Sequence, residues 1–266
     1  MASVVNHEGA SKPKTALVLG AGGGFGAYQA GAWSVLREHI RPDVVIGASV
    51  GSLNGWAIAG GMPVPELCEF WRTARISEEL KFRMARPWNG FFDGMHLEQM
   101  ARHLFESYPA KLEYGAVTTE WRTMRPTLFR SSEITWRHLC ASCAIPGVFE
   151  QQMIAGRLHA DGGLLCALPL WAAAEFGATR VVAIDVWQVG LARLQRLSPF
   201  RKMRNVDAPV TLLTPSEPLG SALDSLFWKR SQIDRWMALG EADARRLVAS
   251  GDFESNISAA ECFERQ

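Results

Sequence analysis

The sequence has almost no excess of charge of either sign. Its 28 lysines and arginines nearly balance 27 aspartates and glutamates, so the formal net charge is +1. A protein without a strong net field has no global attraction to nucleic acid or to an anionic membrane. We therefore expect no nucleic-acid partner, and any peripheral membrane contact has to come from local patches.

Cysteines are also few, and nothing at the start of the chain resembles a secretory signal. The five cysteines are scattered, and the one close pair, Cys140 and Cys143, has no second ligand pair nearby. This favours reduced, inert thiols over a disulfide framework or a metal site. The opening residues MASVVNHEGASKPK lack a basic region followed by an apolar one, which predicts a cytoplasmic protein.

One uncharged stretch is long enough to cross a bilayer, but its composition is wrong for that. Residues 15–36 contain no charged side chain, and six of these 22 residues are glycine. The glycines cluster where a strand would pass into a helix. We interpret the stretch as a buried strand, a loop and a helix.

Apolar runs of strand length predict the fold class. Helical patterns at residues 28–39 and 52–59 follow the first two of the runs, which lie at 16–19, 44–46, 181–186 and 210–213. Buried strands that alternate with helices are typical of an α/β fold, here a three-layer α/β/α arrangement with a mostly parallel central sheet.

The remaining segments divide the chain into one domain with flanks. We expect a domain at residues 15–250, between a flexible segment at 1–14 and a tail at 251–266. Within it, residues 62–110 are helical in pattern with proline and glycine breaks, and we expect a cap or lid there. Residues 223–248 read as one or two amphipathic helices that pack on the core.

The motif that carries chemistry is Gly47-Ala48-Ser49-Val50-Gly51, a G-x-S-x-G sequence. It lies between an apolar strand and a helix, which is the context in which a sharp turn exposes a nucleophilic serine. Glycines two positions to either side avoid clashes at that turn. The following helix directs its positive end toward a developing oxyanion. Ser49 is therefore the predicted nucleophile.

The base that would activate Ser49 is less evident. None of the six histidines lies after residue 159, so the usual order of serine, acid and then a late histidine is not expected. Asp161, at a strand end before Gly162 and Gly163, could act as a general base if burial raises its pKa. The same Asp-Gly-Gly could be only a turn. His159 is a rival base, because it alternates with Asp161 and both could face the same way on a strand.

Four blocks together resemble the bacterial patatin-like phospholipases, lipid acyl hydrolases with a Ser-Asp dyad. The blocks are GAGGGFGAYQAG, GASVG, ASCAIPGVF and ADGGLLCALPL, in the order of the family. Together with the weaker NGFFDGMHLEQMARHLF, they extend the resemblance over roughly residues 15–250.

The resemblance implies roles for individual residues. Ser49 would be the nucleophile, Asp161 its base, and the backbone N–H groups of Gly22, Gly23 and Gly24 the oxyanion hole. The expected partner is a lipid or other ester substrate, and neither a metal nor an organic cofactor is needed. The loop departs from the family at Ala21, which replaces a glycine, and at Phe25, which replaces a basic residue.

Three alternatives remain open from the sequence. A dinucleotide-binding domain would use Gly20 and Asp43, although its third glycine falls on Phe25. An acyltransferase of the malonyl-transferase type would pair Ser49 with His159. A lipid-binding or scaffold protein would carry a vestigial site.

Two segments mix basic and apolar residues and could meet lipid. Residues 71–92 hold five basic residues against two acidic ones, and residues 186–206 have five basic residues and no acidic one. Such mixing suits a lid or a surface that contacts an anionic membrane. A cap packed on the core and a solvated loop are the plainer interpretations of the two segments.

Overall fold

The four apolar runs form neighbouring strands of one large sheet. A computed structural model describes residues 13–74, 94–187 and 206–251. In chain order its elements are β1 (Thr15–Leu19), η1 (Gly23–Phe25), α1 (Gly26–Leu36), β2 (Val44–Ala48), α2 (Val50–Gly60), α3 (Val64–Thr73), α4 (Met95–Ser107), β3 (Glu113–Glu120), β4 (Arg125–Arg130), α5 (Trp136–Ser142), β5 (Gln152–Ile154), β6 (Arg157–Ala160), η3 (Gly162–Leu164), α6 (Trp171–Glu175), β7 (Arg180–Ile184), β8 (Val210–Leu213) and α8 (Arg230–Ala249).

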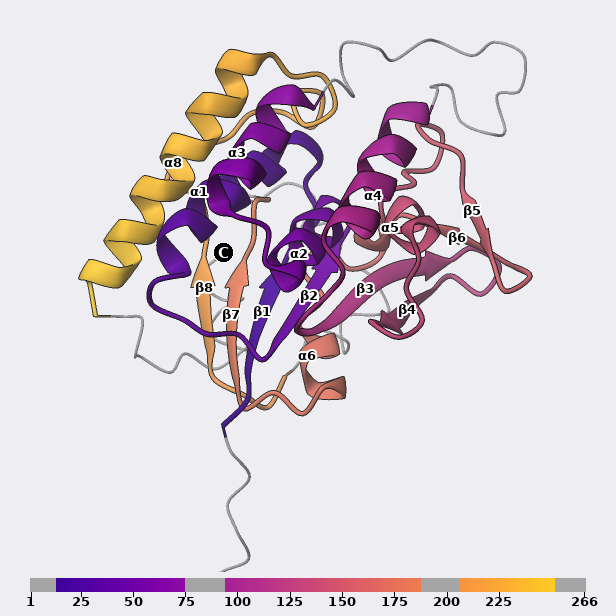
Figure 1. The fold of residues 1–266 in the computed structure, drawn as a ribbon, viewed down its shortest axis with the longest axis horizontal. Helices are drawn as coiled ribbons and strands as arrows, with labels where there is room; N and C mark the ends of the chain where they lie inside the picture. Colours follow the sequence, from indigo (N-terminus) through magenta and orange to yellow (C-terminus); the bar gives the residue numbers. More distant parts are fainter. Residues whose placement is uncertain (1–12, 75–93, 188–205, 252–266) are drawn as a thin grey trace, which may run out of the picture.

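The sheet has eight strands in the order β5-β6-β3-β2-β1-β7-β8, and β4 also pairs with β3. Strands β3, β2, β1, β7 and β8 are parallel, whereas β4 and β6 run antiparallel to β3 and β5 runs antiparallel to β6. The predicted α/β class with a mostly parallel sheet is confirmed. Figure 1 shows the parallel strands side by side, with β5 and β6 at one edge.

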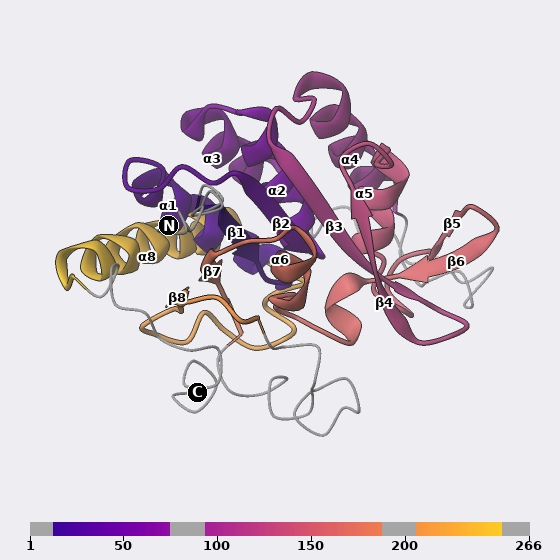
Figure 2. The same ribbon diagram turned by 90° about the horizontal axis from the view of Figure 1, so that it is seen from below.

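Helices cover both faces of the sheet, because successive residues of the central strands point to opposite sides. Leu17 and Leu19 of β1 belong to a core cluster with α1, α2 and α8. Ala16 and Val18 belong to a second cluster that includes α6. Figure 2 shows the sheet between α2 on one side and α6 on the other. The result is the predicted three-layer arrangement.

Helices α1 and α8 cross at close range through a pair of glycines. A Cβ atom on Gly31 would lie 2.0 Å from the Met237 carbonyl oxygen, and one on Gly240 would lie 2.1 Å from the Tyr28 carbonyl oxygen. The buried Asp243 carboxylate accepts a hydrogen bond from the Tyr28 hydroxyl at 3.0 Å. These contacts join the first helix of the chain to the last described one.

Some elements differ from the sequence-based expectation. The expected helical stretch at 223–248 begins only at Arg230, and residues 222–226 form turns. Strands β3, β4 and β5 were not predicted, whereas a strand was expected before Asp161, where β6 lies. In the region expected to be a cap, α3 packs against α1 and α8, and α4 packs against α5 and α2.

Much of the expected flanks and basic segments lies outside the described residues. These parts are residues 1–12, 75–93, 188–205 and 252–266, which include most of the basic-apolar segments at 71–92 and 186–206. Among the helices of the described ranges, none combines the length and the hydrophobicity needed to cross a bilayer. The stretch at 15–36 instead forms β1, the glycine loop and α1, as expected.

Candidate active site

Ser49 occupies a strained turn between β2 and α2. Its backbone has φ 52° and ψ −130°, a conformation that few residues other than glycine adopt. A Cβ atom on Gly47 would lie 2.1 Å from the Gly51 carbonyl oxygen, and one on Gly51 would lie 2.3 Å from the Leu19 carbonyl oxygen. Both glycines of the motif are therefore required by close backbone approach.

Neighbouring serines hold this turn in place. The backbone N–H of Ser49 donates to the hydroxyl of Ser142 at 2.9 Å, and that hydroxyl donates to the Val117 carbonyl at 2.6 Å. On the other side, the Ser52 hydroxyl donates to the Ser49 carbonyl at 2.6 Å. Ser142 was not singled out from the sequence; its one signal was its position inside the ASCAIPGVF block.

Asp161 lies directly against the Ser49 hydroxyl. It follows the last residue of β6, and its Oδ2 accepts a hydrogen bond from Ser49 Oγ at 2.6 Å. Its Oδ1 accepts from the Gly163 backbone N–H at 2.7 Å. The Asp161 backbone is fixed as well: its carbonyl accepts from the Thr119 hydroxyl at 2.9 Å, and its N–H donates to the Ala144 carbonyl at 2.9 Å. The structure thus brings two residues 112 positions apart into contact.

The two glycines after Asp161 are needed because the turn packs tightly. A Cβ atom on Gly162 would lie 2.0 Å from the Val117 carbonyl oxygen, and one on Gly163 would lie 2.4 Å from the Ala21 Cβ. The second contact joins this turn to the glycine loop after β1. The small residue at position 21 therefore has a packing role.

Burial sets the acidity of the Asp161 carboxyl. Loss of solvation raises the pKa of Asp161 from 3.8 to about 7, and the hydrogen bonds from Ser49 and Gly163 oppose that rise. A carboxylate with this pKa is far more basic than an exposed one. It can accept a proton near neutral pH.

His159, the rival base, lies on β6 just before Asp161. Strand β6 ends at Ala160, so Asp161 lies beyond the strand and strict alternation does not extend to it. The His159 Nδ1 lies 2.9 Å from the Thr118 hydroxyl oxygen, and its ring packs edge-on against Phe129. The two side chains thus have different partners, and Asp161 is the one that contacts Ser49. Burial lowers the pKa of His159.

Asp43 is also poorly placed for the role that a dinucleotide site would give it. It precedes β2, and its carboxylate accepts the Thr15 N–H at the start of β1 at 2.9 Å. The glycine loop follows the opposite end of β1, which runs parallel to β2. Asp43 and the glycines therefore lie at opposite ends of the strands.

The glycine loop passes close to Ser49. Gly22 and Gly23 line a pocket together with Ser49 and Asp161. The backbone N–H of Gly24 instead donates to the Ser225 carbonyl at 2.7 Å. A Cβ atom on Gly23, which has φ 54°, would lie 2.3 Å from that same carbonyl oxygen. Of the three predicted oxyanion donors, Gly22 and Gly23 thus border the pocket, whereas the N–H of Gly24 already has a carbonyl acceptor.

Phe25 lies in the core. It is 1% exposed, and its ring packs edge-on against Trp236 at a centroid distance of 4.9 Å and against Trp187 at 5.6 Å. Aromatic packing therefore anchors the glycine loop at Phe25, where the resemblance noted from the sequence implies a basic residue.

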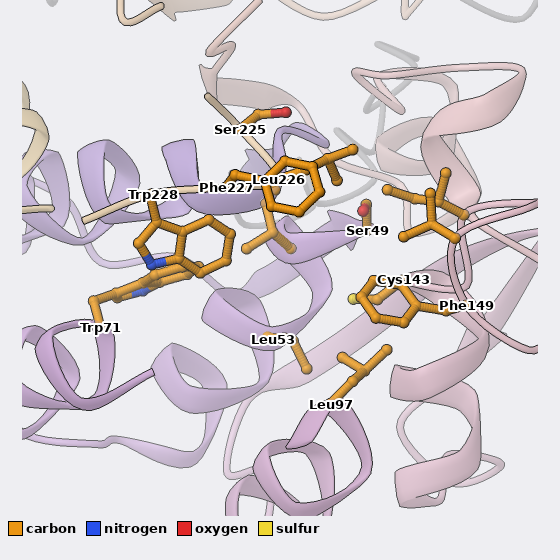
Figure 3. Close-up of a pocket in the computed structure, with 14 residues that line it drawn as sticks. Ser49, Leu53, Trp71, Leu97, Cys143, Phe149, Ser225, Leu226, Phe227 and Trp228 are labelled. Atoms are coloured by element: carbon orange, nitrogen blue, oxygen red, sulfur yellow. The ribbon is translucent and has the colours of Figure 1, made fainter. Parts of the chain in front are cut away.

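Two pockets meet at Ser49. The wider one has a cavity volume of about 220 Å³, and Asp161, Gly22, Leu164 and Trp187 are among its lining residues. The narrower one, of about 40 Å³, has mainly apolar walls that include Trp71 and Trp228. Figure 3 shows these two indoles on one side of the narrow pocket and Ser49 on the other.

A buried polar chain holds one of these tryptophans. The Trp71 indole N–H donates to Asn54 Oδ1 at 2.8 Å, and Asn54 Nδ2 donates to Gln29 Oε1 at 2.9 Å. Gln29 in turn donates to the Gly20 carbonyl at 2.7 Å. Trp228 lies 6.5 Å from Trp71 between ring centroids. This wall was not predicted, because residues 223–228 were expected to be helical.

The cysteines contribute to packing. Cys143 lines the narrow pocket, and burial raises the pKa of the Cys140 thiol to about 12. Within the described ranges, no cluster of three or more histidine, cysteine, aspartate or glutamate side chains is arranged to hold a metal ion.

Sequence and fold comparisons point to one family. A family described as patatin-like phospholipase matches residues 17–174. An uncharacterised NTE family protein of Mycobacterium bovis is 30% identical over 186 residues, covering 67% of this chain and 50% of its own length. Lysophospholipase nte1 of Aspergillus oryzae is 29% identical over 187 residues, covering 65% of this chain and 12% of its own. The chain thus spans about half the length, or less, of these curated relatives.

Among solved structures, VipD from Legionella pneumophila has a similar fold. It superposes with a TM-score of 0.51 at 12% sequence identity, covering 91% of this chain and 67% of that protein. The similarity supports the α/β architecture described above.

Proposed function

The chain belongs to the patatin-like phospholipase family, and from this premise we propose that it is a lipid acyl hydrolase. It cleaves carboxylic esters through an acyl-enzyme on Ser49, with Asp161 as the base. The observation that carries the proposal is the 2.6 Å hydrogen bond from Ser49 Oγ to Asp161 Oδ2 at a strained strand-to-helix turn.

In the first half of the reaction, ionised Asp161 accepts the proton of the Ser49 hydroxyl as Oγ attacks the ester carbonyl carbon. Negative charge then develops on the carbonyl oxygen. When the tetrahedral intermediate collapses, the bond to the leaving oxygen breaks, and that oxygen takes the proton from Asp161. The alcohol or lysolipid departs and Ser49 carries the acyl group.

In the second half, water takes the place of the alcohol. Asp161, ionised again, accepts a proton from a water molecule as its oxygen attacks the acyl carbon. Collapse breaks the bond to Ser49 Oγ, which regains a proton from Asp161, and the fatty acid leaves. The cycle is balanced without a cofactor.

The glycine loop and α2 stabilise the oxyanion. The backbone N–H groups of Gly22 and Gly23 are the proposed donors, supported by their place in the same pocket as Ser49 and Asp161. The N-terminus of α2 adds the positive end of its dipole. Gly24, the third predicted donor, would join only after its hydrogen bond to Ser225 opens.

The two pockets divide the substrate between them. The narrow apolar pocket suits the acyl chain, because burying methylene groups against tryptophan and leucine is favourable by about 0.8 kcal/mol each. The wider pocket, which contains Asp161, suits the leaving group and water. Since a cavity of 10–15 Å³ already holds about one water molecule, 40 Å³ favours a short acyl segment.

The decisive experiment is an ester panel on wild type and S49A. The panel runs from short p-nitrophenyl esters to phospholipid vesicles. We expect S49A to lose at least about 10⁴-fold in kcat, because no other group replaces the nucleophile. Ser225, a second serine that lines both pockets, provides the matched control. S225A should stay within a few-fold of wild type and should still react with a fluorophosphonate probe. Full activity in S49A would disprove the proposal.

A further inference from the structure

Apolar side chains on the neighbouring strands β3, β6 and β5 form a row that is partly exposed to solvent. The N–H of Trp121, just after β3, donates to the Leu158 carbonyl of β6 at 2.8 Å, and Leu158 pairs with Met153 of β5. Directly paired residues of adjacent strands point to the same face of a sheet. Trp121 is 41% exposed and Met153 is 58% exposed. Large apolar side chains thus face solvent at the sheet edge that carries β5 and β6 (Figure 1).

This row lies near the strand ends that carry the candidate active site. The N–H of Trp121 continues the pairing of β3 with β6, and Trp121 follows Thr119 by about 7 Å along these strands. Thr119 pairs with Ala160, and its hydroxyl donates to the Asp161 carbonyl. The exposed row and the segment that holds Asp161 are therefore parts of the same two strands.

The turns beside the row carry positive charge. Residues 121–125 and 153–157 contain Arg122, Arg125 and Arg157 and no acidic residue, and all three arginines are exposed. The acid next in sequence, Glu120, is 5% exposed. Its carboxylate is engaged by the Thr123 hydroxyl and by the Arg122 backbone N–H. These hydrogen bonds lower the pKa of Glu120, which therefore stays ionised, and Glu150 nearby is exposed, so the three arginines leave a net charge of +1 over residues 120–125 and 150–157.

We propose that this strand-end surface docks the protein on an anionic lipid bilayer. The surface is defined by Trp121, Met153, Leu158, Arg122, Arg125 and Arg157. Tryptophan favours the boundary between headgroups and acyl chains, and arginine is attracted to anionic headgroups. A second copy of the chain fits less well, because self-association would bring six arginines together. Docking here would present the lipid beside Asp161.

The test is co-sedimentation with vesicles in the S49A background, so that lipid is not hydrolysed. Vesicles are phosphatidylcholine alone or with about 30% phosphatidylglycerol, at physiological salt. We expect R122Q/R125Q/R157Q to bind the anionic vesicles up to about 100-fold more weakly, at about fivefold per arginine, with a weaker salt dependence. We expect W121A/M153A to bind at least about tenfold more weakly.

The matched control is R230Q/R235Q/R245Q. It removes three exposed arginines from α8, which lies on the opposite side of the molecule from β5 and β6 (Figure 1). Its binding should equal that of the S49A parent. Equal loss in both triple variants, unchanged binding of W121A/M153A, or no binding of the parent would overturn the proposal. A change of oligomeric state in W121A/M153A would also overturn it, in favour of a contact between copies.

Failure of this inference can be distinguished from failure of the proposed function. Hydrolysis of a water-soluble p-nitrophenyl ester is measured on the same substitutions with Ser49 intact. Loss of vesicle binding with unchanged hydrolysis of the soluble ester supports the docking surface. Absence of any Ser49-dependent hydrolysis counts against the proposed function and leaves the vesicle result to be judged by itself.

Discussion

The two pockets that meet at Ser49 differ in what their walls contain. The wider pocket holds the buried carboxylate of Asp161 and backbone groups of the glycine loop. The narrower one is walled by side chains such as Leu53, Trp71 and Trp228. Both pockets have mainly apolar walls, but Asp161 lines only the wider one, so Ser49 lies between a region that contains a carboxylate and a region that does not. A change in the first should reduce the rate on every ester, whereas a change in the second should alter which ester is preferred.

The largest effect is expected from D161N, in the wider pocket. Asparagine keeps the shape of the side chain but cannot accept the serine proton, so kcat should fall about 10⁴-fold for all acyl lengths alike. The matched control is D185N, another aspartate that is 5% exposed but lines neither pocket. If the loss of kcat in D161N depended strongly on acyl length, the two pockets would not have the separate roles assigned to them.

Because D161N removes a buried ionisable group, stability should change in a defined direction. The raised pKa of Asp161 means that the native state binds its proton more tightly than the unfolded state. Wild-type stability from this group is therefore greatest below pH 4 and declines as pH rises to about 7. D161N should melt no lower than wild type at pH 8, which separates lost catalysis from lost folding.

The second prediction is the pH profile of wild-type kcat/KM. Since the pKa of Asp161 is raised to about 7, the carboxyl is protonated below that value and cannot act as base. The rate should fall about tenfold per pH unit below 7, reaching about 100-fold at pH 5, and level off above it. A profile that is flat from pH 5 to 8 would show that this carboxyl does not control the reaction.

The third prediction concerns the narrower pocket. W228F shortens one wall, so longer acyl chains should gain room for one or two methylenes. The ratio of kcat/KM for an eight-carbon ester to that for a four-carbon ester should rise about fivefold to tenfold. Trp56 is the control, because it is equally well buried but packs against Phe105 and Tyr114, outside both pockets. An equal change of the ratio in W56F would count against the assignment.

The smallest effect is expected from S142A, which touches neither pocket's chemistry directly. It leaves the Ser49 N–H without its hydrogen-bond acceptor, at a cost of about 1–3 kcal/mol to the turn. We expect about a threefold lower kcat, because only part of this cost falls on the transition state, with little change in KM and no change in acyl preference. S34A provides the control, because Ser34 donates to the Gly31 carbonyl within α1, away from the site. A fall in S142A no larger than that in S34A would exclude a positioning role.

Four of the five parallel strands were predictable because they are short continuous apolar runs. These are β1, β2, β7 and β8, and their predicted positions agree with the structure. Strands β3, β4 and β5 were missed, whereas a strand was expected before Asp161, where β6 lies. The residues of β4 are half-buried or exposed, and β5 has only three residues, so neither carries a continuous apolar signal.

The parts of the site that could be predicted are those where the backbone conformation allows only certain residue types. The turn at Ser49 requires glycines at 47 and 51, and that requirement appears as a motif. The contact between Ser49 and Asp161 depends on the pairing of β6 with β3, which the sequence did not reveal. The wall at Leu226 and Trp228 depends on turns that come from the far end of the chain, where no local pattern indicates a pocket.

The hydrogen bond from Gly24 to Ser225 joins a part of the chain that is synthesised early to a part that is synthesised late. Its two partners are separated by about 200 residues, and Trp228 packs over the same glycine. Domains form during synthesis from the N-terminal end, so the glycine loop and Ser49 leave the ribosome long before their last wall does. A nascent chain therefore carries Ser49, the proposed nucleophile, before its pockets are finished, and they are completed only when the stretch before α8 has emerged.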